Sequence, residues 1–488
     1  MASIEEIRNA RLEKLHLLQA KGVNPYPVTA ERDCSLAEAA ESFSKLSKKK
    51  SLALAGRIML LRPQGGLIFF TFDDGTGRFQ GLIKKDSADT GIFDLFSRVV
   101  DIGDFVEVHG KFFLTKRKEK TIEVKSWRLL SKSLRPLPEK WHGLQDVEER
   151  FRKRYLDLLM NEEVRTRFVL RSRMVKALRG LLDQEGFLEV DTSMLQPLAG
   201  GANALPFVTR HNALGIDLYL RVAPELDLKK LLVGGLPKIY EIGRSFRNEG
   251  VDATHNPEFT TVEWYEAYSS AERQRAFVER TVKAVVKEAV GDKKVVFDGN
   301  QIDFGKPFAT VRYFELLQRY ALITDPAKIS RGEIALKAAQ LGVKVEPADG
   351  VEKIMDGIYK KTCRPKLIQP AFIIDYPKNY IPLAKKKDGD DTLVDAFQLV
   401  AGGMEIAKAF SELNDPIDQR ERFSTQEKNR EAGDKEAQPN DELFLESLEY
   451  GCPPAGGVGI GLDRLTMLLT DAKNIKEVIL FPTLRPKG

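Results

Sequence analysis

Charged and aromatic residues recur at strand spacing in one segment of this 488-residue sequence. Arg247 and Glu249 are two residues apart, and a second group follows after the turn-rich stretch 250–257. Its members alternate along the chain: Phe259, Thr261, Glu263 and Tyr265. Successive side chains of a strand point to opposite faces, so we expect each alternating set on one face of a hairpin. A surface with a cation, carboxylates, a ring and a phenol is a poor core, but it suits a small ligand with charged and flat parts.

A second candidate segment combines alternating glycines with an arginine. Gly457, Gly459 and Gly461 alternate, and Arg464 follows in what reads as the first turn of a helix. Glycine allows close approach of backbone and ligand because it has no Cβ. Neither segment is specific alone, since Arg-x-Glu is commonly a surface ion pair and a glycine-rich strand before a helix is commonly a packing device. Their order and spacing are more informative than either segment.

Three ordered motifs carry a family resemblance. They are a helix ending near Gly186 followed by 187–197, the pair of segments 246–249 and 255–265, and the glycine-rich segment 457–465. In this order they resemble motifs 1, 2 and 3 of the class II aminoacyl-tRNA synthetases. Further stretches resemble the bacterial-type lysyl-tRNA synthetases of class IIb: 200–202, 218–226 and 410–416. The resemblance covers nearly the whole chain.

The resemblance implies an enzyme, a lysine–tRNA ligase. It would activate L-lysine with ATP to lysyl-adenylate and transfer the lysyl group to the 3′-terminal adenosine of tRNA-Lys, with Mg²⁺ as cofactor. Such adenylation needs no protein nucleophile, because two anions must only be aligned while phosphate charge is neutralised. Guanidinium groups suit this task, since they bind phosphate oxygens in pairs and stack on rings. The motif 1 match also implies a homodimer.

The resemblance assigns roles to individual residues. As catalytic residues, Arg247 would hold the α-phosphate and the substrate carboxylate, and Arg464 the γ-phosphate. The implied ATP-binding residues are Arg247, Glu249, His255, Phe259, Glu405 and Arg464. The implied lysine-binding residues are Gly201, Glu225, Arg247, Glu263, Tyr265, Lys408, Phe410 and Glu412.

Specificity for lysine would depend on two separated acidic positions, because a buried unpaired ammonium is costly. The family places the α-amino group against Glu225 and Glu263, and the ε-ammonium against Glu412 with Tyr265. Two structural alternatives remain open at this stage. Glu225 could cap a helix that begins near Pro224, and Glu412 could pair with Arg420 or Arg422.

The implied metal ligands are Glu405 and Gln398, and here the chain departs from the family pattern. Gln398 stands where a glutamate is common, and Lys408 stands where an asparagine is common. Leu205 and Ile381 also replace an arginine and a serine. The first two changes make the site about two charge units more positive. We hypothesise that the Lys408 ammonium takes over part of the electrostatic role of magnesium and that Glu405 is the main metal ligand.

The region before the linker is rich in short β segments. Strands are expected at 52–61, 67–72, 78–83, 105–114 and 121–127, with a helical insert at 93–99. This pattern predicts a five-stranded barrel of the OB type. Phe69 and Gln80 are expected to point outward, where a ring and an amide can stack on a base and read its edge. By resemblance Arg62, Phe69, Gln80 and Glu123 would bind the anticodon.

The domain order follows from these segments. We expect an amphipathic helix and lead-in at 1–50, an OB-fold anticodon-binding domain at 51–131 and a linker at 132–150. A catalytic domain would occupy 151–488, with a helical insertion at about 271–365. Its strands and helices lack βαβ periodicity, which favours an α+β fold with a mostly antiparallel sheet flanked by helices. Neither a Rossmann nor a P-loop glycine motif occurs at a strand–helix junction.

Composition agrees with the prediction of a large soluble enzyme. The net charge of +5 is too small to indicate nucleic-acid binding without a local patch. The cysteines, Cys34, Cys363 and Cys452, have no metal-ligand spacing and fit a reducing compartment. The polar N-terminus and the lack of a long apolar run predict a cytoplasmic protein with no membrane association.

Two other functions remain open from the residues. An aspartyl- or asparaginyl-tRNA synthetase would share this architecture, but it would need cations where Glu412 and Tyr265 stand. A synthetase-like RNA-binding or regulatory protein without charging activity would explain the unusual Gln398 and Lys408. Such a protein would be expected to lose some of the arginines and carboxylates that this chain retains.

Overall fold

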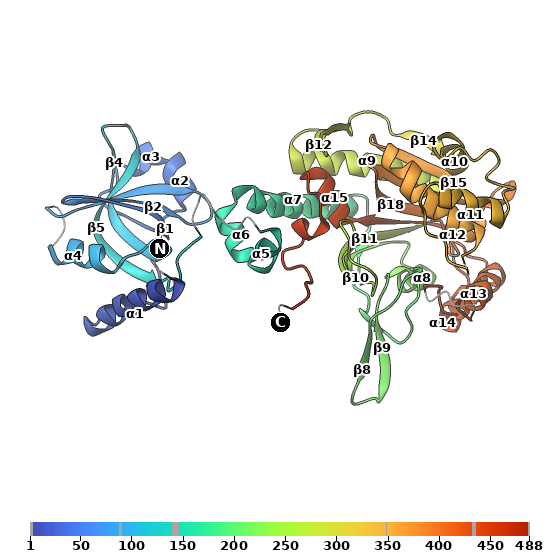
Figure 1. Cartoon of the computed structure of the whole chain (residues 1–488), viewed down its shortest axis with the longest axis horizontal. Coiled ribbons are helices and arrows are strands. Elements are labelled where there is room, and N and C mark those ends of the chain that lie inside the picture. The colour runs from blue at the N-terminus through green and yellow to red at the C-terminus, as the bar shows by residue number, and fades with distance from the viewer. Residues whose placement is uncertain (1–2, 87–89, 139–145, 348, 432–435, 487–488) are drawn as a thin grey trace. The chain divides into compact units, whose positions relative to one another are not determined.

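The computed structural model describes residues 3–86, 90–138, 146–347, 349–431 and 436–486 (Figure 1). The chain forms two compact units, Met1–Leu144 and Gln145–Gly488, and each is described by itself. None of the helices in the described ranges is long and apolar enough to cross a membrane.

The N-terminal unit is a closed barrel with strand order β1-β2-β3-β5-β4. Its strands are β1 (Leu52–Gln64), β2 (Leu67–Asp73), β3 (Arg78–Lys84), β4 (Phe105–Leu114) and β5 (Lys120–Ser131). α4 (Thr90–Val99) lies between β3 and β4 in the chain. Apolar side chains alternate inward and fill the barrel, including Phe70, Phe72 and Ile83. The prediction of a five-stranded OB-type barrel is confirmed.

One longer helix and two short helices precede the barrel in the described part of the chain. α1 (Ile4–Ala20) begins with a capping box in which Ser3 and Glu6 bond reciprocally to backbone amides. α2 (Leu36–Glu41) and α3 (Phe43–Leu46) follow. Leu18, Leu36 and Phe43 are buried against the barrel core, as expected for the apolar side of a packed helix.

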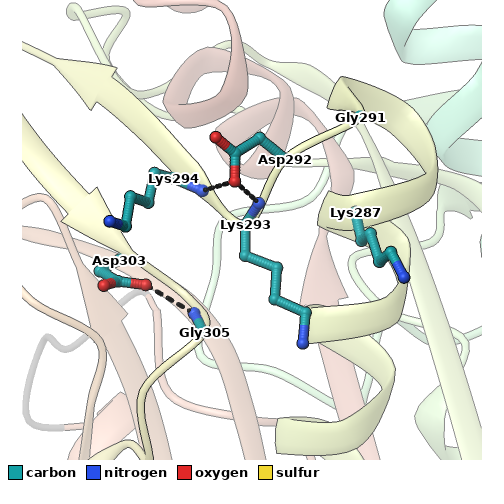
Figure 2. A pocket seen from close by; sticks show the side chains of 7 residues that line it. All are labelled: Lys287, Gly291, Asp292, Lys293, Lys294, Asp303 and Gly305. Atoms are coloured by element: carbon teal, nitrogen blue, oxygen red, sulfur yellow. Dashed lines mark hydrogen bonds between the residues drawn. The ribbon is translucent and has the colours of Figure 1, made fainter.

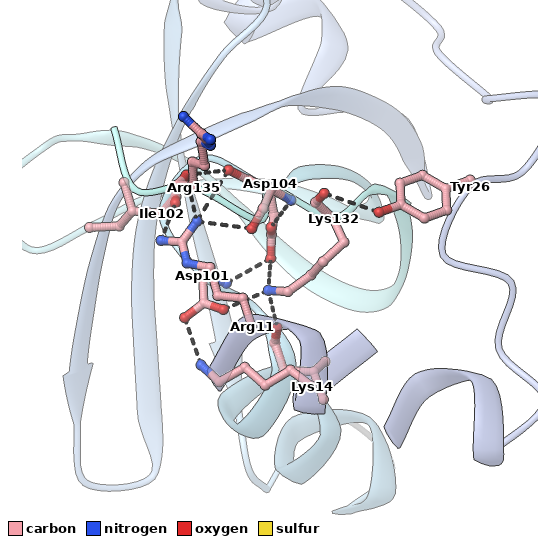
Figure 3. Close-up of polar contacts among 10 residues, drawn as sticks. Arg11, Lys14, Tyr26, Asp101, Ile102, Asp104, Lys132 and Arg135 are labelled. Carbon is pink, nitrogen blue, oxygen red and sulfur yellow. Dashed lines mark hydrogen bonds and ion pairs between the residues drawn. The ribbon is translucent and has the colours of Figure 1, made fainter. Parts of the chain in front are cut away.

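An ion-pair network connects α1 with the barrel (Figure 3). Lys14 contacts Asp101 at 2.6 Å, and the fully buried Lys132 lies 2.6 Å from Asp101 and 2.7 Å from Asp104. The Arg11 guanidinium donates to the backbone carbonyls of Ile102, Ser133 and Arg135. Because Arg11, Asp104 and Lys132 are buried, the network holds the leading helix against its own unit, which supports a packing role for α1.

The C-terminal unit is built on a nine-stranded sheet. Its main order is β14 (Ala309–Arg312), β15 (Ala371–Pro377), β17 (Asp390–Ala401), β18 (Met404–Ser411), β19 (Ala455–Gly461), β11 (Glu258–Ala267), β10 (Lys238–Phe246) and β6 (Leu188–Glu189), with β16 (Lys386–Lys387) beside β17. Only β14 with β15 and β10 with β6 pair in parallel among these described strands. The predicted, mostly antiparallel sheet is therefore confirmed.

Helices cover both faces of this sheet. α7 (Glu162–Gln184), α9 (Ala271–Val290) and α15 (Leu462–Leu469) pack on one face and share the largest apolar cluster with it. The other face is covered in part by α8 (Glu225–Val233), α10 (Tyr313–Ala321), α12 (Val351–Ile358), α13 (Pro416–Glu431) and α14 (Glu442–Glu449). The uncovered part of this second face carries the candidate site described below.

The remaining elements surround the sheet. They are α5 (Val147–Arg152), α6 (Arg154–Met160), α11 (Arg331–Gln340), the sheet of β7 (Leu195–Gln196), β9 (Ile216–Leu220) and β8 (Val208–His211), and the pair β12 (Lys294–Phe297) and β13 (Asn300–Asp303). A π-helical turn at Tyr359–Cys363 extends α12, and single 3₁₀ turns follow at Arg364–Lys366, Lys378–Tyr380 and Ile475–Val478. The segment 271–365 thus contains three short strands in addition to its expected helices.

Candidate active site

The register of the sheet brings several predicted site residues into adjacent rows. β19 lies between β11 and β18, so Gly459 is opposite both Glu263 and Lys408. Lys408 is in turn opposite Gln398 on β17. The next row contains Tyr265, Gly457 and Phe410. Residues directly opposite on neighbouring strands project from the same face, so both rows form one surface.

Along β19, glycines that face this surface alternate with apolar residues that point into the core. Val458 and Ile460 point into the core shared with α9, whereas Gly457, Gly459 and Gly461 face the site. A Cβ at Gly457 would overlap Oε1 of Glu412 and the ring of Tyr265. A glycine is required at 457 because these two side chains occupy the space above it.

One end of the surface is acidic and buried. Glu225, at the first position of α8, and Glu412, directly after β18, are 8% and 1% exposed. Both carboxylates contact the ammonium of Lys229: Nζ lies 2.7 Å from Oε1 of Glu225 and forms an ion pair with Oε2 of Glu412. The helix carries no side-chain cap hydrogen bond at Pro224. The charge of Glu225 also acts on Glu263, Tyr265 and Lys408, so its carboxylate faces the site.

The structure also resolves the alternative partners of Glu412. Arg420 pairs with Glu442 at 2.9 Å, and Arg422 pairs with Asp418 at 3.0 Å. Among the described side chains, Oε1 of Glu412 has no hydrogen-bond partner. This buried, unpartnered oxygen is available to a positively charged ligand.

Glu263 and Tyr265 extend the acidic end along β11. The Tyr265 hydroxyl donates to Oε2 of Glu263 at 3.0 Å. Burial, reinforced by the nearby charge of Glu225, raises the pKa of Glu263 to about 8. Burial likewise raises the pKa of Glu412 to about 8, although Lys229 acts to lower it. Such groups favour a bound cation, because its charge compensates their burial.

Gly201 and Phe410 complete this end. Gly201 has a φ of +92°, and a Cβ there would lie 3.4 Å from the Cβ atoms of Ala223 and Glu225. The left-handed backbone favours glycine. The Phe410 ring is buried, and its centroid is 5.3 Å from Nζ of Lys229. Both residues therefore lie beside the acidic groups.

The other end of the surface is cationic. Arg464, in the first turn of α15, donates from Nη2 to Nε2 of His255 at 2.9 Å. A guanidinium cannot accept, so Nε2 accepts and Nδ1 of His255 carries the proton that faces Asp252 at 2.9 Å. Nη1 of Arg464 donates to the Glu405 carbonyl at 3.4 Å. These contacts place Arg464, His255 and Glu405 together.

Arg247 lies between the two ends. Its guanidinium carbon is 5.1 Å from the centroid of the Phe259 ring, and Nε is buried with no partner among the described atoms. The charge of Arg247 acts on both Glu263 and Arg464. It lowers the pKa of the Glu263 carboxyl and so opposes the effect of burial. Arg247 is thus placed where one cation can reach ligands at either end.

The expected placement of Arg247 and Glu249 on one strand face is wrong. β10 ends at Phe246, and both residues lie in the following loop. The backbone amide of Asn248 donates to the Leu205 carbonyl at 2.7 Å instead of continuing the hairpin ladder. The turn-forming sequence Asn248–Gly250 explains this departure.

Around Glu405, cations greatly outnumber carboxylates. Burial acts to raise the pKa of Glu405, but Arg464, Lys408, Arg364 and Lys360 outweigh it and hold the pKa below its usual value. The described residues contain no group of three His, Cys, Asp or Glu side chains suited to a metal ion. Magnesium commonly uses one or two carboxylates together with substrate phosphates. Glu405 therefore fits one magnesium ion shared with phosphates, and Gln398, whose buried Oε1 has no partner among the described atoms, stays a predicted ligand.

The predicted anticodon residues gather on the outer face of the barrel. Arg62, Phe69, Leu82 and Glu123 form one row across β1, β2, β3 and β5. Gln80 lies in the adjacent row and accepts from Nη2 of Arg62 at 3.3 Å. Glu123 is 3.0 Å from both Lys84 and Lys125. A partly exposed ring flanked by polar groups is suited to base stacking.

A hollow of about 360 Å³ lies elsewhere, beside the end of α9 (Figure 2). It is lined by Lys287, Gly291, Asp292, Lys293, Lys294, Asp303 and Gly305. Both aspartates bond to backbone amides around it. None of the predicted site residues lines this hollow, so we do not assign the chemistry to it.

Comparison with known families agrees with this geometry. Residues 146–485 match the family described as tRNA synthetases class II (D, K and N), and residues 52–130 match the OB-fold nucleic acid binding domain. The chain therefore belongs to the class II tRNA synthetases.

Relatives that match over their full length narrow the comparison to one kind of synthetase. A protein of Moorella thermoacetica is 49% identical over 483 residues, covering 99% of this chain and 98% of the relative. Proteins of Pelotomaculum thermopropionicum and Carboxydothermus hydrogenoformans are 46% and 45% identical, again over 99% of this chain and over 96% and 99% of the relatives. All three are named lysine–tRNA ligase.

Sequence reasoning missed several charged residues of the site, among them Lys229 and Arg364. Lys229 was not distinguished because the segment 225–233 reads as an ordinary amphipathic helix. Its spacing of four from Glu225 was the available signal. Arg364 follows the π-helical turn, whose irregular backbone has no simple sequence pattern.

Proposed function

We propose that this protein activates L-lysine with ATP and transfers the lysyl group to tRNA-Lys. The observation that carries this proposal is the arrangement on one sheet face of a buried acidic group and a cationic group, with Arg247 between them. An amino acid with two ammonium groups complements the first group, and the phosphates of ATP complement the second. The names of the full-length relatives support the same reaction.

The proposed roles follow from these contacts. The carboxylates of Glu225 and Glu263 would bind the α-amino group, and Glu412 with Tyr265 would bind the ε-ammonium. Gly201 and Phe410 would shape this end. Arg247 would bind the α-phosphate and the substrate carboxylate together, so the attacking oxygen is held in line with phosphorus.

The cationic end would bind the rest of ATP. Arg464 would contact the γ-phosphate, and His255 would contact the phosphates while Asp252 fixes its tautomer. Phe259 would stack on adenine, and Glu249 would read its edge. These residues lower the barrier by orientation and charge neutralisation, without a covalent intermediate.

We propose that magnesium binds with ATP at Glu405, where it would neutralise phosphate charge. Lys408 would supply further positive charge at the same place, because its ammonium is one of the charges that act on Glu405. Lysine activation by Lys408→Asn should therefore need a higher magnesium concentration than activation by the wild type. Titration of manganese bound in the presence of a non-hydrolysable ATP analogue gives an independent readout. An unchanged magnesium requirement in both measurements would contradict the role of Lys408.

We propose that the outer barrel face binds the anticodon through Arg62, Phe69, Gln80 and Glu123. We further propose a homodimer. Exposed apolar side chains occur on or next to α7, β6, β7, β8 and β9: Val169, Leu188, Met194, Leu195, Val208, Leu214 and Ile216. Such a surface is typical of subunit contacts. Sedimentation equilibrium of the wild type and of Leu188→Asp would test it, because the variant should dissociate.

The domain limits 1–50, 51–131, 132–150 and 151–488 and a cytoplasmic location are also part of the proposal. The cysteines of the described ranges are free thiols, which supports a reducing compartment.

Pyrophosphate exchange with a panel of amino acids tests the main proposal. Lysine should support exchange of radiolabelled pyrophosphate into ATP, whereas aspartate and asparagine should not. Exchange with either of those two would favour an aspartyl- or asparaginyl-tRNA synthetase. Exchange with none, while the protein still binds RNA, would favour a binding protein without charging activity.

A further inference from the structure

Lys229 is a buried cation inside the proposed lysine site. Its side chain is 1% exposed, and its ammonium lies between Glu225 and Glu412. The rings of Phe410 and Phe444 lie 5.3 and 6.0 Å from Nζ, measured to the ring centroids. A lysine that is almost completely buried is uncommon unless it is paired, so its position requires an explanation.

The fold holds this lysine in place from two directions. Glu225 and Lys229 are four residues apart on α8, so both side chains project from one side of the helix. Glu412 comes from the end of β18, where its backbone amide donates to the Ala455 carbonyl at 2.8 Å. The ammonium therefore connects a helix that borders the site to the sheet that forms its floor.

The charges at this end are matched to a substrate with two ammonium groups. When ionised, Glu225, Glu263 and Glu412 carry three negative charges, and Lys229 compensates one of them. Burial raises the pKa values of Tyr265 and Cys452, which also face this group, so both remain neutral. Two negative charges are left, and lysine brings two ammonium groups while its carboxylate can pair with Arg247.

The two oxygens of Glu412 have different surroundings. Oε2 faces Lys229, whereas Oε1 lies above Gly457 beside the Tyr265 ring and has no partner among the described residues. An ion pair on one oxygen fixes the rotation of the carboxylate and directs the other oxygen toward the floor of the site.

We infer that Lys229 is a positioning residue for the amino-acid substrate, whose ammonium holds the carboxylates of Glu225 and Glu412 together and leaves Oε1 of Glu412 as the acceptor for a substrate ammonium. This inference rests on the proposed function. Lys229 would act as a permanent counter-ion for one of the three nearby carboxylates. The two ammonium groups of a bound lysine would then balance the other two. Lys229 lowers the pKa of Glu412 against burial, so without it that pKa would rise further and the incoming lysine would have to displace a proton up to a higher pH.

The experiment measures lysine binding by calorimetry between pH 6.5 and 9.5. Lys229→Gln removes the charge but keeps a hydrogen-bond donor, and Lys229→Met removes both. The lysine Kd of either variant should rise at pH 7 by about tenfold for each unit by which the carboxyl pKa increases. The difference in lysine Kd between variant and wild type should narrow as the pH rises, because the Glu412 carboxyl group ionises again.

Lys230→Gln is the matched control. Lys230 is the next residue on α8, but it is partly exposed and pairs with Asp227 at 3.3 Å. This variant should have the same pH profile as the wild type. A Kd that is unchanged in Lys229→Gln, or raised equally at every pH, would overturn the inference and indicate a structural role. If the wild type binds no lysine at any pH, the proposed function itself fails.

Discussion

Gly457→Ala should impair lysine recognition because the added methyl group has no space. The ideal Cβ would overlap Oε1 of Glu412 and two ring carbons of Tyr265, and both side chains are buried. Overpacking of this kind commonly costs about 1–3 kcal/mol. Relief by moving Glu412 would remove a charge-assisted hydrogen bond to the ε-ammonium, which is worth about 1.5–3 kcal/mol.

These energies set the expected kinetic effect. Since about 1.4 kcal/mol corresponds to a factor of ten, the KM for lysine should rise by about 10- to 150-fold. The KM for ATP should change little, because the methyl group is at the acidic end. Lysine-dependent pyrophosphate exchange measures both constants.

Gly461→Ala is the control for this prediction. Gly461 lies on the same face of β19, but a Cβ there would be 4.0 Å from its nearest neighbours, Cβ of Arg464 and the Ile406 carbonyl. Its lysine KM should stay within about threefold of the wild type, a change below 1 kcal/mol. A similarly small change in Gly457→Ala would refute the placement of Glu412 beside the strand.

Three further predictions concern other parts of the chain. The raised pKa of Glu263 means that the folded protein binds a proton more tightly than the unfolded chain, so stability should fall as the pH rises from about 4.5 to 8; thermal unfolding should show a weaker decline in Glu263→Gln, and equal declines would contradict the burial of this group. Phe69→Ala should raise the KM for tRNA by about 10- to 100-fold through loss of stacking, while pyrophosphate exchange stays normal; an unchanged aminoacylation KM would exclude a role in RNA binding. Lys132→Met should destabilise the N-terminal unit by about 3–5 kcal/mol in a denaturant titration, since the buried Asp104 would lose its ion pair. Lys14 is partly exposed, so Lys14→Met should cost about 1 kcal/mol or less. Equal losses of unfolding free energy in the two variants would contradict the burial of Lys132.

Some of this structure could be predicted from local sequence pattern. The barrel strands were predictable because Ile68, Phe70 and Phe72 alternate with residues that face outward. The start of α1 was predictable from the capping box of Ser3 and Glu6. In both cases neighbouring residues determine the local structure.

Other features depend on distant segments and were not predictable in this way. The loop position of Arg247 depends on a backbone bond from Asn248 to Leu205. The pairing of Lys229 with Glu412 joins residues far apart in the chain. Resemblance identified Glu225, Glu263 and Glu412 as candidates, but only their spatial arrangement reveals the cation that they share.

The position of β19 limits how the protein can select among diamino acids. Backbone hydrogen bonds fix β19 to β11 and β18, so Glu263 and Phe410 cannot shift independently along the floor. In the proposed lysine site, selection by side-chain length would therefore depend on a sheet surface whose strands are fixed to one another. Under the proposed function, ornithine, which is one methylene shorter than lysine, should therefore bind more weakly than lysine.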